Sequence, residues 1–168
     1  CSTYRHLPIL EPGYSRVPRR KIKGEVIRVT ETERDLFHEA VKIALEKDGW
    51  VISDDPLKVE VGGAKFEIDL GAERLLAAER EGVRIAVEIK TFLSDSPITD
   101  YHAALGQFLN YKLALELSDP DRRLYLAVPV TVHAAFFQRE FLQISVERYQ
   151  IQRIIYDPLK EVIVQWIN

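Results

Sequence analysis

Apolar residues recur at two spacings along the chain, and these spacings distinguish expected helices from expected strands. Residues 32–48 carry apolar side chains three and four positions apart, which predicts an amphipathic helix. Gly49 follows directly and is the expected end of that helix. Longer stretches over residues 97–117 and 131–148 predict two further helices.

Short apolar or alternating runs predict the strands of a sheet. These runs span residues 50–52, 65–70, 83–92, 124–128, 151–156 and 162–166. Residues 73–80 read as a strand that pairs with residues 83–92, but they also have helix propensity, so both assignments stay open. The expected order is α-β-β-β-α-β-α-β-β, a mixed α/β fold in which helices flank a central sheet.

Three charged residues occupy alternating positions in two of these strands. Asp69 lies on the polar side of its strand, and Glu88 and Lys90 share one face of theirs. If the two strands pair, the carboxylates and the Ile89 carbonyl are hard oxygen ligands suited to Mg²⁺ or Mn²⁺. Lys90 would then orient the attacking water or stabilise charge on a phosphate. The alternative is ordinary polar alternation on a half-exposed strand.

The predicted helices add three candidate residues. Gln107 and Tyr111 lie on one stripe of the 97–117 helix, where they can hydrogen-bond near a metal or a DNA phosphate. The alternative is an amphipathic helix with two polar residues at its edge. His38 lies near the border of the apolar stripe on the first helix, which favours it as a group facing the site. A single histidine in such a position is more often structural.

Composition limits the class of protein. With 168 residues, 46% of them apolar and 29% charged, the chain is expected to form one soluble globular domain. No apolar run is long enough for a membrane span. Cys1 is the single cysteine, so neither an internal disulfide nor a cysteine-rich zinc site is expected, and a reducing cytoplasm fits best.

Charge is distributed unevenly along the chain. Residues 1–30 hold seven Lys or Arg and two acids, a balance of +5, and the other residues hold 16 bases and 24 acids, a balance of −8. We therefore expect a basic, irregular arm or extension over residues 1–30 and a single acidic domain over residues 31–168. An acidic body argues against a strong general DNA binder. It remains compatible with a metal-dependent nuclease, because bound cations reverse the local charge.

Several longer stretches carry a family resemblance. They cover residues 34–42, 47–50, 68–73, 86–90, 102–111 and 162–168. On these stretches the chain resembles the XisH family, the fdxN-element excision controlling factors of cyanobacteria. The resemblance implies a restriction-endonuclease-like, or PD-(D/E)xK, fold and nuclease site. The motif acid would be Asp69, the Glu-x-Lys pair Glu88 and Lys90, and the Gln-x-x-x-Tyr pair Gln107 and Tyr111.

Two positions depart from the pattern of this superfamily. Ile68 stands where a proline usually precedes the motif acid, which the fold tolerates. His38 stands where many relatives carry a glutamate on the first helix, which weakens a standard metal site.

The resemblance also implies a biological setting. It implies excision of a DNA element during heterocyst differentiation, beside a serine site-specific recombinase and a partner of the XisI family. A homodimer is a reasonable expectation for a protein that acts on duplex DNA. Two classes of function stay open: an active Mg²⁺-dependent endonuclease, and a non-catalytic factor that binds DNA or a partner through a nuclease-like fold.

Overall fold

The computed structural model describes residues 20–22, 25–27, 29–74 and 82–168. They belong to two compact units, residues 1–35 and 36–168. In the first unit, β1 (Arg20–Ile22) pairs antiparallel with β2 (Glu25–Ile27). This part of the basic arm is therefore extended rather than irregular, and most of the rest of the arm lies outside the described residues. The helix α1 (Val29–Lys47) begins in the first unit and ends in the second.

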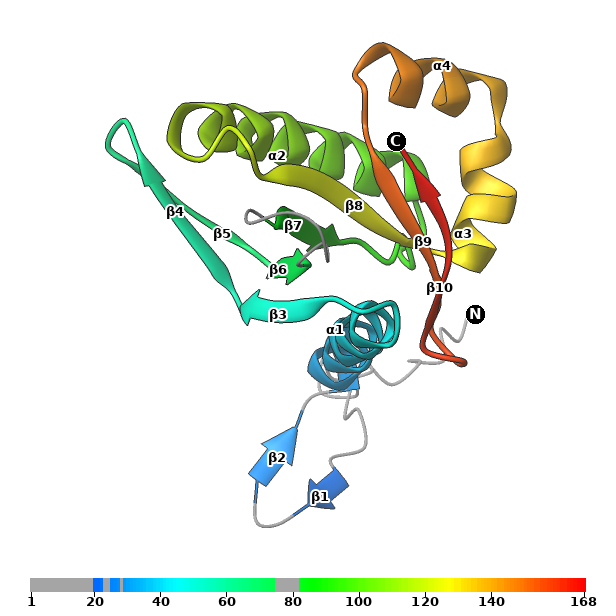
Figure 1. The fold of residues 1–168 in the computed structure, drawn as a ribbon. Helices are drawn as coiled ribbons and strands as arrows, with labels where there is room; N and C mark the ends of the chain where they lie inside the picture. The colour runs from blue at the N-terminus through cyan, green and yellow to red at the C-terminus, as the bar shows by residue number, and fades with distance from the viewer. Residues whose placement is uncertain (1–19, 23–24, 28, 75–81) are drawn as a thin grey trace, which may run out of the picture. The chain divides into compact units, whose positions relative to one another are not determined.

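Six strands of the second unit form a mixed sheet in the order β10-β9-β8-β7-β6-β3 (Figure 1). The strands are β3 (Val51–Asp54), β6 (Leu70–Arg74), β7 (Val83–Ile89), β8 (Arg123–Pro129), β9 (Arg153–Asp157) and β10 (Val162–Ile167). β8 is parallel to β7 and β9, and the other neighbours pair antiparallel. Parallel neighbours need long crossover connections, and here these are helical.

Helices cover both faces of this sheet. α2 (Pro97–Ser118) connects β7 to β8 and packs on one face together with α4 (Glu140–Arg148), as Figure 1 shows. α1 packs on the opposite face. The central strand β8 is buried on both sides, with Leu124, Leu126 and Val128 toward α2, and Tyr125 and Ala127 toward α1. The predicted mixed α/β architecture is therefore confirmed.

The predicted strand over residues 65–70 is wrong as a single element. It divides at Asp69 into β5 (Ala64–Ile68) and β6. β5 pairs with β4 (Leu57–Val61) in a separate two-stranded sheet, whereas β6 joins the six-stranded one. β4 was not predicted, and it adds a strand to the expected order of elements. Of the uncertain 73–80 segment, residues 73 and 74 are in β6, and the rest lies outside the described residues.

The helix predicted over residues 131–148 is also wrong as one element. It divides into α3 (Val130–Ala135), a 3₁₀ turn (Phe136–Gln138) and α4. Arg139 separates the 3₁₀ turn from α4 because its backbone is extended, with φ −63° and ψ 137°. Among the described helices, none is both long and apolar enough to cross a bilayer.

The end of α1 confirms the role predicted for Gly49. Gly49 donates its N–H to the Glu46 carbonyl at 3.0 Å. Trp50 donates to the Leu45 carbonyl, also at 3.0 Å. This pair of bonds is a Schellman motif, which requires a positive φ at its turn residue. Gly49 has φ 89°, a conformation that glycine adopts without a steric penalty.

Candidate functional site

The site is built where two strands of the main sheet meet the β4–β5 hairpin. Asp69 lies between β5 and β6, and β6 pairs with β7 so that Leu70 faces Val87. Continuing this register by one position places Asp69 opposite Glu88. Two hydrogen bonds hold the pair: the Ile89 amide donates to Asp69 Oδ2 at 2.7 Å, and the Asp69 amide donates to Glu88 Oε2 at 3.3 Å. The predicted convergence of these strands is therefore present in the structure.

Glu88 is a buried carboxyl, with 6% of its surface exposed. Burial raises its pKa to about 7, and the charge of Asp69 adds to this effect. The charge of Lys90 and the hydrogen bond from the Asp69 amide lower the pKa of Glu88, but by less. The Lys90 Nζ lies 3.5 Å from Glu88 Oε1, so Lys90 is the cation that partly compensates the two carboxylates.

A strained turn follows the Glu88–Lys90 segment. Phe92 adopts φ 53°, an uncommon value for a residue with a bulky side chain. Its buried ring lies 5.3 Å from the Phe137 ring and 5.9 Å from the Phe136 ring, measured between centroids. Such a backbone persists where the surrounding packing imposes it. The aromatic cluster thus fixes the point at which the chain leaves β7, directly after Lys90.

The helix α2 contributes Tyr111 to the site. The Tyr111 side chain is half-buried, and burial raises the pKa of its phenol. The charges of Glu88 and Asp69 raise it further, so the hydroxyl lies within electrostatic reach of both carboxyls. Its ring packs edge-on against Phe66 of β5 at 5.9 Å. Gln107, one turn earlier, is exposed, and no hydrogen bond connects it to any described residue of the site.

His38 belongs to a different cluster. Its Nε2 lies 2.8 Å from Asp55 Oδ1, and Lys42 Nζ lies 2.8 Å from Asp55 Oδ2. Burial alone would raise the pKa of Asp55, but the hydrogen bonds from Lys42 and His38 lower it. Among the described side chains, no hydrogen bond or ion pair joins His38 to Asp69 or Glu88. The structure therefore gives His38 a partner, Asp55, that was not predicted from the sequence.

The donor set can be compared with the needs of a metal ion. Within the described part of the chain, no group of three or more His, Cys, Asp or Glu side chains is placed to hold an ion. Asp69 and Glu88 supply two carboxylates, and the Ile89 backbone lies beside Asp69, to which its amide donates. Mg²⁺ prefers such hard oxygen ligands and retains several waters, so two carboxylates are sufficient for it. These residues fit a water-rich Mg²⁺ or Mn²⁺ site.

Comparisons with known proteins agree on one family. The family model described as XisH protein matches residues 32–164. The chain is 50% identical to an XisH family protein from Nostoc punctiforme PCC 73102, with a TM-score of 0.74. It is also 50% identical to an fdxN element excision controlling factor protein from Anabaena variabilis, with a TM-score of 0.73. Each match covers 80% of this chain and 100% of the other. Among curated proteins, none matches this chain.

Proposed function

The chain belongs to the XisH family, and we propose that it is a metal-dependent, endonuclease-like factor that assists excision of a DNA element. The relative from Anabaena variabilis is described as an fdxN element excision controlling factor. In this proposal the protein acts on DNA beside a serine site-specific recombinase and a XisI-family partner.

The arrangement of Asp69, Glu88 and Lys90 is the observation that carries the proposal. Two carboxylates lie side by side at the junction of β5, β6 and β7, and a lysine amine lies 3.5 Å from one of them. Restriction-endonuclease-like nucleases need this set: two acids for a metal and a lysine for the attacking water. We therefore propose that the chain also belongs to the PD-(D/E)xK superfamily.

Each residue has a distinct role in this proposal. Asp69, Glu88 and the Ile89 carbonyl hold the ion, which when bound lowers the pKa of a coordinated water and stabilises charge on the phosphate. Lys90 positions the water and adds positive charge beside the scissile phosphate. Tyr111 and Gln107 on α2 position the DNA backbone by hydrogen bonds.

A second candidate function rests on how fully the polar atoms of the site are already bonded. Asp69 Oδ2 accepts the Ile89 amide, Glu88 is paired with Lys90, and His38 is engaged by Asp55. A site in this state also suits a non-catalytic factor that binds DNA, the recombinase or a XisI-family partner on the same fold.

One cleavage assay separates the two candidates. Supercoiled, linear and branched DNA are incubated with the protein and Mg²⁺, Mn²⁺ or a chelator, with and without a XisI-family partner. We expect metal-dependent nicking or cutting that falls at least about a hundredfold in Asp69→Ala and in Lys90→Ala.

Glu67→Ala and Lys65→Ala are matched controls, because both side chains are exposed on β5 and neither belongs to the cluster. Both controls should cut as the wild type does. Absence of metal-dependent cutting under every condition, with DNA or partner binding intact in the Asp69 and Lys90 variants, would establish the non-catalytic factor instead.

A further inference from the structure

A second feature of the molecule lies away from the carboxylate cluster. A cavity of about 990 Å³ opens between α2, α4 and strands β8 to β10. Its lining includes none of Asp69, Glu88 and Lys90. Buried apolar side chains form part of its wall, among them Phe108, Phe137 and Ile151. Cavities of this size hold drug-sized or cofactor-sized molecules.

Arg153 is the unusual residue of this cavity. It lies in β9 between Leu126 of β8 and Ile167 of β10. Its Nε is buried and makes no hydrogen bond within the described structure. Its guanidinium carbon lies 5.9 Å from the centre of the Phe137 ring, and no described carboxylate forms an ion pair with it. Burial lowers the pKa of Arg153, because removal from water disfavours its charged form.

Arg153 has no counter-charge among the described residues. Burying a cation without an anion or hydrogen bonds is unfavourable, so such a group ordinarily has a partner. Glu147 and Glu116 also line the cavity, but neither makes an ion pair with Arg153. Lys112, Arg122 and Arg123 add three further cations to the wall. The excess of positive charge favours an anionic ligand.

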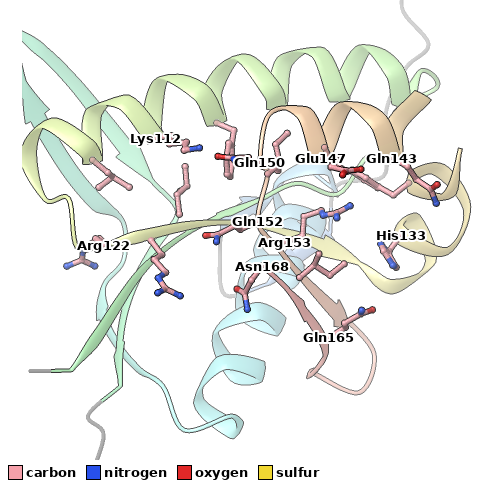
Figure 2. A pocket seen from close by; sticks show the side chains of 18 of the residues that line it. Lys112, Arg122, His133, Gln143, Glu147, Gln150, Gln152, Arg153, Gln165 and Asn168 are labelled. Atoms are coloured by element: carbon pink, nitrogen blue, oxygen red, sulfur yellow. The ribbon is translucent and has the colours of Figure 1, made fainter. Parts of the chain in front are cut away.

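Other polar groups surround Arg153. Figure 2 shows His133 and Arg153 beneath α4, with Gln143 and Glu147 projecting from that helix. The Nδ1 of His133 is buried without a hydrogen bond, and burial together with the charge of Arg153 lowers the pKa of its imidazole. Both effects favour the neutral form of His133 beside Arg153. Gln138 donates to the His133 carbonyl at 3.0 Å, which orients this side of the cavity.

The backbone at one edge of the cavity is also unusual. α4 ends in the same Schellman pattern as α1, with Gln150 donating to Glu147 at 3.1 Å and Ile151 donating to Val146 at 2.9 Å. The turn residue here is Gln150, with φ 51°, where α1 has Gly49. A side chain in this conformation is strained. Gln150 lines the cavity, and strained backbone of this kind is often found at binding sites.

We propose that this cavity binds a nucleotide, free or at the end of a DNA strand, whose phosphate pairs with Arg153. Arginine forms strong paired hydrogen bonds with phosphate oxygens. The apolar wall at Phe108 and Ile151 accommodates a base, and the amides of Gln143 and Gln150 can pair with its polar edge. The site is independent of the proposed metal cluster and remains meaningful if that cluster has no nuclease activity.

The test is a binding titration by calorimetry in the presence of a chelator, so that no metal at Asp69 and Glu88 contributes. The probes are deoxynucleoside monophosphates, an uncharged nucleoside, orthophosphate, a dicarboxylate, and short single-stranded DNA with and without a terminal phosphate. We expect the monophosphates to bind and Arg153→Met to weaken that binding by roughly tenfold or more. A preference for the phosphorylated strand over the free nucleotide would identify the DNA end as the source.

Three further proteins make this titration decisive. Arg148→Met removes an exposed arginine of α4 that does not line the cavity and should bind as the wild type does. Arg153→Lys retains the charge without the planar fork and should show intermediate affinity. Lys65→Ala, at an exposed position of β5 that does not line the cavity, should bind as the wild type does. Absence of nucleotide binding, binding unaffected by Arg153→Met, or equal or tighter binding of orthophosphate or the dicarboxylate would overturn the proposal.

Discussion

A buried Glu88 and a half-buried Arg153 lie on the same face of the main sheet, and the fold supplies an oppositely charged partner only to Glu88. Glu88 shares a strand face with Ala86, and Arg153 shares one with Ile155, and both apolar residues pack toward α2. Glu88 has Lys90 and a backbone amide beside it, whereas Arg153 has a phenylalanine ring and, among the described residues, no carboxylate partner. The charge of Arg153 that is left without a partner indicates an anionic ligand, whereas Lys90 already compensates part of the charge of Asp69 and Glu88.

Phe137 connects the two regions, so its removal should have the largest effect. Its buried ring packs against Phe92, which follows Lys90, and against the guanidinium of Arg153. We expect Phe137→Ala to lower the free energy of unfolding by about 3–5 kcal/mol, because it leaves a large cavity. Chemical denaturation measures this change. Exposed Phe141→Ala is the matched control and should change stability little. Equal effects of the two substitutions would show that the aromatic cluster does not organise these regions.

The pH dependence of stability tests the compensation at Glu88. Its pKa is about 7 in the folded protein and 4.5 in an ordinary environment, so the folded state keeps a proton that the unfolded chain releases. The contribution of protonated Glu88 to the free energy of unfolding is therefore complete below pH 4.5. It is lost as pH rises through 7, a decrease of roughly 3 kcal/mol. Glu88→Gln should abolish this slope in the metal-free protein. Denaturation midpoints across this range that coincide for both proteins would contradict the assignment.

The effect of Mg²⁺ on stability tests whether Asp69 and Glu88 bind a cation. A cation between Asp69 and Glu88 favours their ionised forms, so it should stabilise the wild type at neutral pH. It should stabilise Glu88→Gln much less. Thermal unfolding with and without the metal measures the difference, and Glu67→Gln on β5 should respond as the wild type does.

The two Schellman turns carry different turn residues, Gly49 after α1 and Gln150 after α4, and substitutions at both test the cost of a side chain at positive φ. Gln150→Gly should stabilise the protein by about 0.5–1 kcal/mol, because glycine relieves the strained φ, whereas Gly49→Ala should destabilise it by a similar amount. Denaturant titration measures both changes. If Gln150 has a binding role, Gln150→Gly should also weaken nucleotide binding while it stabilises the fold. Stabilisation with unchanged binding would assign Gln150 a purely structural position.

Arg153→Met should have the smallest effect on stability. Since no carboxylate of the described residues pairs with Arg153, loss of its charge removes a desolvation penalty and none of the described ion pairs. We expect a change between zero and about 1 kcal/mol in the stabilising direction, measured without ligand. Destabilisation of several kcal/mol would instead mean that Arg153 supports the fold directly.

Local pattern alone predicted much of the candidate site. The two-residue period of a strand places Glu88 and Lys90 on one face whatever the rest of the fold does, and helical spacing relates Gln107 to Tyr111. The hairpin strand β4 had a signal as well, since Leu57, Val59 and Val61 alternate with charged residues.

Other features depended on contacts between distant segments. His38 finds Asp55 across 17 positions of the chain, and neither residue type predicts the other. The break at Asp69 arises because β5 and β6 pair with different partners, which the alternation of a continuous run does not reveal.

By itself, the sequence determined the family, the mixed α/β class and the shared strand face of Glu88 and Lys90, because these depend on local periodicity and on motifs of adjacent residues. Only the tertiary structure decided which charges are buried and which are compensated. Enclosure of the Arg153 Nε requires β8, β9 and the turn that carries Phe137 to come together around it, and removal of a charge from water depends on that three-dimensional enclosure.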